Sequence, residues 1–163
     1  MNMRILMLGN SFTFYNDMPG LLAELTGAEV VFHTRGGARL AEQLNPETEM
    51  GARTLEALEN EKWDYVILQE QSNAPVTTKE AFLQSVSALC EKARHAGATP
   101  ILYATWAYQE GSEKMAEMSI GYDVMAAQMS ASYHEAAGVI ASNGEENGSE
   151  AKLSKGREFA KTL

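Results

Sequence analysis

A serine follows the first apolar run of the chain at a spacing that suits a nucleophile. Gly9, Asn10 and Ser11 come directly after the run Ile5–Leu8. If that run is a buried strand, Gly9 permits a tight exit from it, and Ser11 presents its hydroxyl ahead of the next helix. A serine hydroxyl attacks a carbonyl carbon when a general base takes its proton. Ser11 is therefore the candidate nucleophile, and a cap or turn residue is the alternative interpretation.

Hydrogen-bond donors follow two further apolar runs. Gly36 and Gly37 come after the second run, and Gln71 comes after the third. Paired glycines let a backbone N–H approach an anion closely, and a glutamine side chain adds an amide donor. Donors that converge where negative charge develops form an oxyanion hole. We predict that the amides of Ser11 and Gly37 form such a hole together with the side chain of Gln71.

Residues near these donors are candidates for the walls of a substrate pocket. The pocket that we predict contains Asn10, Phe12, Gly36, Asn73, Trp106 and Tyr108. Trp106 and Tyr108 follow the fourth apolar run, where covering the core is the alternative role. No Cys/His cluster has the spacing of a metal site, so we expect neither a metal nor a cofactor.

Five apolar runs predict the strands that must position these residues. The runs are Ile5–Leu8, Glu29–Phe32, Tyr65–Leu68, Ile101–Ala104 and Val139–Ala141. The first, third and fourth are continuously apolar, as strands buried on both faces are. Segments with helical spacing alternate with the runs, which is typical of a parallel sheet covered by helices. We predict an α/β fold, a three-layer α/β/α flavodoxin-like sandwich with a five-stranded, mainly parallel sheet, whose ligand binds beyond the carboxyl ends of the strands.

The helical spacing also gives approximate boundaries. The expected helices are one around Leu21–Leu25 that ends at Gly27, one region over Leu40–Leu58 that is broken at Asn45-Pro46 and restarts near Glu47, one from about Thr78 to His95, one from about Ser112 to Ala137, and a short last one within Glu150–Leu163. The break is expected because proline is disfavoured inside a helix. Thr77 or Thr78 is the expected N-cap of the helix from about Thr78 to His95.

Length and charge limit the classes of partner. The chain has 163 residues, a net charge of −9 and one cysteine. This length predicts a single domain over residues 1–163. An acidic surface disfavours nucleic acid and anionic membranes as partners, and the apolar runs are too short to span a bilayer. One cysteine and no signal segment lead us to expect a soluble cytoplasmic protein with a small-molecule partner, while a homo-oligomer stays open.

Several segments together resemble the sequence blocks of the SGNH (GDSL-like) hydrolases. Ile5–Thr13 resembles the first block, with Gly-Asn-Ser in place of Gly-Asp-Ser, and Gly36–Leu40 resembles the second. Trp63–Ser72 is similar to the third block of a bacterial subgroup, with Gln-Glu-Gln-Ser in place of Gly-x-Asn-Asp. Thr105–Tyr108 also resembles that subgroup. The resemblance covers about residues 3–140.

This resemblance implies a function and assigns roles. It implies a flavodoxin-like fold and hydrolysis of carboxylic esters, such as acyl or acetyl esters of carbohydrates or lipids. Ser11 is then the nucleophile, and the amide of Gly37 serves the oxyanion hole. Gln71 occupies the position of the family's oxyanion asparagine.

The fourth element of the family, Asp-x-x-His, does not occur in the sequence. The aspartates are Asp17, Asp64 and Asp123, and none has a histidine three positions later. His33, near the carboxyl end of the second strand, is the candidate substitute base, and a strand-end histidine without a catalytic role is the alternative. Because a serine without a base is a poor nucleophile, we expect weak or no activity from this chain.

Two other functions stay open at this stage. A non-catalytic module on the same fold would bind a carbohydrate or acyl ligand in the pocket. A flavodoxin-like protein would hold a phosphate or a cofactor after the first strand, although the sequence lacks the G-x-G-x-x-G and Walker patterns. Labelling of Ser11 by a fluorophosphonate separates the hydrolase from both alternatives.

Overall fold

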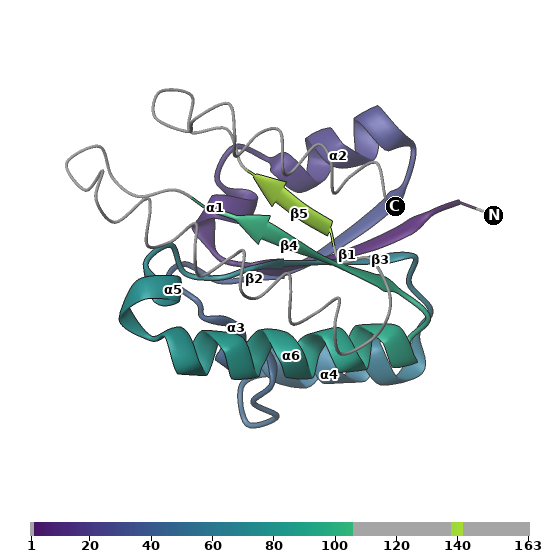
Figure 1. Cartoon of the computed structure of the whole chain (residues 1–163). Coiled ribbons are helices and arrows are strands. Elements are labelled where there is room, and N and C mark those ends of the chain that lie inside the picture. The colour runs from purple at the N-terminus through teal and green to yellow at the C-terminus, as the bar shows by residue number, and fades with distance from the viewer. Residues whose placement is uncertain (1, 106–137, 142–163) are drawn as a thin grey trace.

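The computed structural model describes residues 2–105 and 138–141 (Figure 1). The elements are β1 (Arg4–Gly9), α1 (Ser11–Phe14), α2 (Met18–Thr26), β2 (Glu29–Thr34), α3 (Leu40–Gln43), α4 (Glu49–Asn60), β3 (Tyr65–Gln69), α5 (Ala74–Thr77), α6 (Lys79–His95), β4 (Thr99–Ala104) and β5 (Gly138–Ala141). These strands form one sheet in the order β2-β1-β3-β4-β5, and every neighbouring pair is parallel. The predicted α/β class and parallel sheet are confirmed.

Part of the prediction falls on undescribed residues. The helices expected within 112–137 and 150–163 lie outside the described residues, and so do Trp106 and Tyr108. The total number of strands stays a prediction for the same reason. Among the helices that the structure describes, none is long and apolar enough to cross a membrane.

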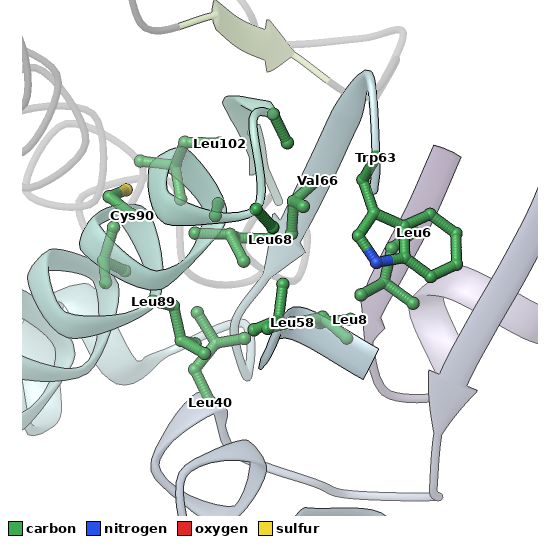
Figure 2. Packing of buried hydrophobic residues seen from close by; sticks show 14 of the residues in the cluster. Leu6, Leu8, Leu40, Leu58, Trp63, Val66, Leu68, Leu89, Cys90 and Leu102 are labelled. Carbon is green, nitrogen blue, oxygen red and sulfur yellow. The ribbon is translucent and has the colours of Figure 1, made fainter. Parts of the chain in front are cut away.

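Side chains of β1 alternate between two apolar layers. Leu6 and Leu8 belong to the cluster that packs against α3, α4 and α6, whereas Ile5 and Met7 belong to the cluster that includes side chains of α2. Figure 1 shows α4 and α6 on one face of the sheet and α2 on the other, and Figure 2 shows the larger cluster at close range. Successive residues of a strand point to opposite faces, so an unbroken apolar run is what a sheet covered on both faces requires.

Helix boundaries follow local sequence signals. Gly27 ends α2 with a left-handed φ of 70°, as expected of a glycine C-cap. The region broken at proline forms two helices, and Thr48 caps the second by accepting a hydrogen bond from the amide of Gly51. Thr78 precedes α6, but its hydroxyl makes no capping hydrogen bond. The two short helices α1 and α5 were not predicted.

Strand order determines where a ligand can reach the chain. β1 lies between β2 and β3, so the loops after these three strands emerge at the same edge of the sheet. The chain passes from β1 to β2 on one side and then crosses to β3 on the other. This reversal is the switch point where α/β sheets bind ligands, and Ser11, Gly37 and Gln71 follow these three strands.

Candidate active site

Ser11 is the first residue of α1 and is half-buried. Asn10 precedes it as the N-cap, and its side-chain oxygen accepts a hydrogen bond from the amide of Phe12 at 3.1 Å. The amide of Thr13 donates to the carbonyl oxygen of Asn10 at 2.9 Å. The first amides of a helix have no acceptor within the helix. The Asn10 cap supplies acceptors for the amides of Phe12 and Thr13 but not for the amide of Ser11. Within the described residues, neither the amide nor the hydroxyl of Ser11 has a hydrogen-bond partner.

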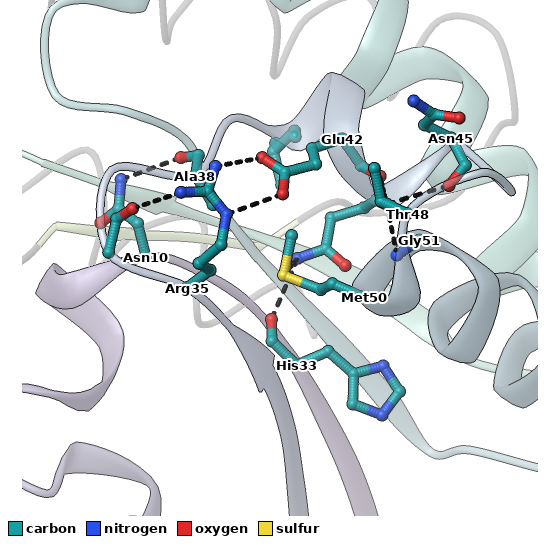
Figure 3. A network of polar contacts seen from close by, with 12 residues as sticks. Asn10, His33, Arg35, Ala38, Glu42, Asn45, Thr48, Met50 and Gly51 are labelled. Carbon is teal, nitrogen blue, oxygen red and sulfur yellow. Dashed lines mark hydrogen bonds and ion pairs between the residues drawn. The ribbon is translucent and has the colours of Figure 1, made fainter.

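Asn10 also connects the loop that carries Ser11 after β1 (the serine loop) to the loop that carries Gly36 and Gly37 after β2 (the glycine loop). The Asn10 side chain is 2% exposed, and its Nδ2 donates to the carbonyl oxygen of Ala38 at 3.1 Å. Figure 3 shows Asn10 directly beside this loop. A buried hydrogen bond between two loops fixes their separation more firmly than an exposed one, since no water competes for it. The residue before the candidate nucleophile is thus held against the residue after Gly37.

Gln69, the last residue of β3, holds the serine loop from the other side. Its Oε1 accepts hydrogen bonds from the amide of Asn10 and the hydroxyl of Thr13, both at 2.9 Å. A Cβ at Gly9 would collide with Thr13 Oγ1 and Gln69 Oε1. Gly9 is therefore needed for this close approach, because only a residue without a side chain leaves room for Gln69 beside the loop.

Glu70 ties the loop after β3 to the start of α3. Its Oε1 accepts hydrogen bonds from the amides of Leu40 at 3.1 Å and Gln71 at 2.7 Å. Burial raises the pKa of the Glu70 carboxyl, and the two backbone donors and Arg39 act in the opposite direction. Each pair of the three loops is thus joined by a buried side chain: Asn10, Gln69 or Glu70.

The glycine loop forms an exposed turn. The amide of Ala38 donates to the carbonyl oxygen of Arg35 at 3.1 Å, and Gly37 has a left-handed φ of 69°. A Cβ at Gly36 or Gly37 would meet no atom within 4 Å, so the space beside both residues is open. Arg35 forms an ion pair with Glu42 across the turn (Figure 3). The amide of Gly37 has no hydrogen-bond partner among the described residues.

Gln71 is half-buried in the loop after β3. Its side-chain Oε1 is buried without a hydrogen-bond partner, and no described group accepts from its Nε2. Buried polar groups are ordinarily hydrogen-bonded, so the unpartnered Oε1 calls for a donor, whereas the Nε2 of the same amide is the group that could donate to an oxyanion. The three predicted oxyanion donors thus lie on loops at one edge, and each lacks an acceptor among the described residues. Such an arrangement suits an anion or a carbonyl oxygen that gains negative charge.

His33 lies in β2 and is 5% exposed. Its Nδ1 is 2.8 Å from Oγ1 of Thr54, whose hydroxyl donates to Gln43 Oε1 at 2.6 Å. The single hydroxyl proton is used on Gln43, so the neutral ring donates from Nδ1. Burial, followed by the charge of Arg53, lowers the pKa of His33. In Figure 3 the ring points away from Asn10, the neighbour of Ser11. The structure therefore joins His33 to α3 and α4, and no described contact joins it to Ser11.

The other predicted residues lie around this edge. Phe12 is in α1 and half-exposed, and Asn73 is exposed at the start of α5 without a side-chain capping bond. No group of three or more histidine, cysteine or acidic side chains within the described residues could hold a metal ion. Cys90 is buried in the core, where burial raises the pKa of its thiol to about 12.

Sequence reasoning did not identify three polar residues as connections between the loops of this site. Thr13, Gln69 and Glu70 are all buried and hydrogen-bonded between loops. One signal was available: Gln69 and Glu70 continue an apolar run that is buried on both faces. A polar side chain at the end of such a strand must find a partner.

The chain shows clear similarity to solved structures. A protein of Slackia heliotrinireducens classed as an SGNH hydrolase is 40% identical over 99% of both chains, with a TM-score of 0.77. TesA is 18% identical over 98% of this chain and 97% of its own, with a TM-score of 0.64. A protein from Desulfitobacterium hafniense described as lipolytic, of the G-D-S-L family, is 17% identical over 99% and 100%, also with a TM-score of 0.64. No family model and no curated protein matches the chain.

Proposed function

The chain belongs to the SGNH hydrolases, and from this premise we propose that it hydrolyses a carboxylic ester with Ser11 as the nucleophile. The observation that carries the proposal is the set of polar groups left without partners. Around Ser11, the buried polar side chains Asn10, Gln69 and Glu70 are hydrogen-bonded. The Ser11 hydroxyl and the proposed oxyanion donors have no acceptor among the described residues. A substrate that adds a carbonyl oxygen to this edge would satisfy them.

The reaction follows from these positions. Ser11 Oγ attacks the ester carbonyl carbon, and the carbonyl oxygen becomes an oxyanion held by the amides of Ser11 and Gly37 and the side chain of Gln71. A base takes the serine proton and returns it to the departing alcohol. Water then attacks the acyl-serine, which releases the acid and restores the hydroxyl.

The base determines how fast this reaction runs. Asp-x-x-His is absent from the sequence, and the described contacts of His33 go to Thr54 and Gln43. We therefore expect slow turnover, with attack by Ser11 limiting the rate. Replacement of His33 by Gln tests it as a substitute base, because loss of a group that takes the serine proton should lower kcat and change the pH profile of kcat, whereas loss of a positioning residue lowers kcat alone.

The substrate class is an acyl or acetyl ester of a carbohydrate or lipid. The open space at Gly36 and Gly37 supports an ester whose carbonyl enters from solvent beside the glycine turn. Hydrolysis of p-nitrophenyl esters of increasing acyl length, compared with an acetylated sugar, separates lipid-like from carbohydrate substrates.

Ser11 labelling tests the proposal directly. We expect a fluorophosphonate to modify Ser11 and to abolish hydrolysis of p-nitrophenyl acetate. Ser11→Ala should lose both labelling and hydrolysis. Ser72→Ala is the matched control, since Ser72 is a half-exposed serine in the loop after β3, and it should retain both. Labelling that persists in Ser11→Ala would contradict the assignment.

A non-catalytic binding module is the second candidate. The observation in its favour is that neither described histidine, His33 or His95, has a described hydrogen bond to Ser11. Such a module would bind an acylated or acetylated ligand without consuming it. Calorimetry with an acetylated sugar distinguishes the two, because a module gives a stable complex and an esterase releases acetate.

A further inference from the structure

We propose that Glu70 is a positioning residue of this site, which fixes the Gln71 donor and the loop of Gly37 relative to each other. The inference rests on the proposed ester hydrolysis at Ser11. It assigns a role to a carboxylate that the reaction itself does not use.

A single oxygen atom makes the connection. Glu70 Oε1 accepts from the amide of Gln71, in the loop after β3, and from the amide of Leu40, the first residue of α3. Leu40 lies three positions after Gly37 in the same connection. Two of the three proposed donors, Gly37 and Gln71, are thus attached, through short stretches of backbone, to the same carboxylate oxygen.

Burial strengthens the two hydrogen bonds of Glu70 and makes the carboxylate depend on both donors. The Glu70 side chain is 3% exposed, and burying a carboxylate is unfavourable unless donors surround it. Hydrogen bonds to an ionised acceptor are about twice as strong as neutral ones. An apolar residue would fill this place without a desolvation cost but would leave the amides of Leu40 and Gln71 unpaired. The carboxylate therefore fixes the amides of Leu40 and Gln71 at one point between the two loops.

Glu70 contacts the loops that carry two of the three proposed donors, Gly37 and Gln71, and no described hydrogen bond joins it to Ser11. The described ties of the serine loop come from Asn10 and from Gln69, whose Oε1 accepts from Asn10 and Thr13. Loss of Glu70 should therefore weaken stabilisation of the oxyanion, which develops only in the transition state, and leave ground-state binding of the ester nearly unchanged. This separates a positioning role from a general loss of folding.

The experiment compares Glu70→Ala and Glu70→Gln with wild type on p-nitrophenyl acetate. Removing one oxyanion-hole donor costs about 100-fold or more in kcat, so Glu70→Ala should lower kcat by about 100-fold with little change in KM. Glu70→Gln keeps an acceptor oxygen at the same length and should recover most of this loss. Asp64→Asn is the matched control: Asp64 precedes the same strand and accepts from the amide of Arg4 at 2.7 Å, so its kcat should stay at the wild-type value.

Amide hydrogen exchange gives a second readout that does not depend on turnover. Glu70→Ala should accelerate exchange at Leu40 and Gln71, and Asp64→Asn should not. Wild-type kcat in Glu70→Ala, or equal loss in the Ala and Gln variants, overturns the positioning role. A wild-type protein without Ser11-dependent hydrolysis instead refutes the proposed function, and with it the role of Glu70 in that function.

Discussion

The two ends of the central strands β1 and β3 are built from different chemistry. At the amino end, Arg4 forms ion pairs with Glu29 at 2.9 Å and Glu61 at 2.8 Å, and its guanidinium lies 4.2 Å from the ring centroid of Trp63. These charges are partly or largely exposed. At the carboxyl end, the side chains of Asn10, Gln69 and Glu70 are buried, and their hydrogen bonds join neighbouring loops.

The two ends differ in how strongly their polar side chains hold the chain in place and in whether they leave hydrogen-bond donors for a ligand. The ion pairs at the amino end are in contact with solvent, which screens them, so each adds little to stability. Buried amide and carboxylate groups cannot exchange a lost partner for water, so each holds its loop firmly. At the carboxyl end, the amides of Ser11 and Gly37 and the side-chain Nε2 of Gln71 also have no acceptor among the described residues. Rigid loops around unpartnered donors are what a preorganised site requires.

Among the substitutions that test this contrast, Gln69→Leu should cause the largest loss of stability. It leaves the amide of Asn10 and the hydroxyl of Thr13 buried without an acceptor, at about 1–3 kcal/mol each. We expect the free energy of unfolding to fall by about 2–6 kcal/mol and fluorophosphonate labelling of Ser11 to slow. Urea denaturation and labelling kinetics, measured where the variant is folded, check both effects.

Gln43→Leu is its control. Gln43 is equally buried and hydrogen-bonds to His33 and Thr54, away from the serine loop. It should destabilise the fold to a similar extent and leave the labelling rate of the folded protein unchanged. Equal slowing in both variants would show that labelling follows overall stability and not the position of the serine loop.

Gly37→Ala should lower the stability by an intermediate amount and should also lower kcat. A left-handed conformation costs an L-residue about 1–2 kcal/mol, and no atom near Gly37 would clash with a new Cβ. Gly27→Ala is matched to it, because Gly27 has a φ of 70° and equally open surroundings at the end of α2. Denaturation midpoints should fall by similar amounts, whereas kcat for p-nitrophenyl acetate should fall only in Gly37→Ala. The same kcat loss in Gly27→Ala would remove the special role of the glycine turn.

The sequence predicts the strands of the sheet better than the hydrogen bonds that join the loops after them. Continuous apolar runs such as Ile5–Leu8 and Tyr65–Leu68 permit a strand buried on both faces, and the structure has strands there. The break before α4 follows from Pro46, a local effect of one residue. Such features depend on short stretches of chain, so they can be identified without knowing what packs against them.

The ties at the carboxyl edge depend on residues far apart in the sequence. Gln69 and Asn10 are 59 positions apart, and Glu70 and Leu40 are 30 apart. Their pairing follows from the strand order, which brings the three loops together, and from side-chain directions that no local pattern gives. His33 illustrates the same point: the sequence predicts its place near the carboxyl end of the second strand, but its contact with Thr54 depends on how α4 packs.

Glu29→Gln, at the amino end, should have the smallest effect. The variant loses the attraction that lowers the pKa of Glu29, but Arg4 keeps Glu61 and the carbonyl oxygen of Lys62 as partners. Since Glu29 is exposed and salt screens it, we expect almost no change in the denaturation midpoint in 0.5 M NaCl and only a slight decrease at low salt. Because the folded pKa is lowered, that decrease should appear above the ordinary pKa of a glutamate and disappear as acid protonates the wild-type carboxylate. A midpoint change as large as that of Gln69→Leu, at either salt concentration, would mean that the amino end also fastens the sheet, and the contrast between the two ends would no longer hold.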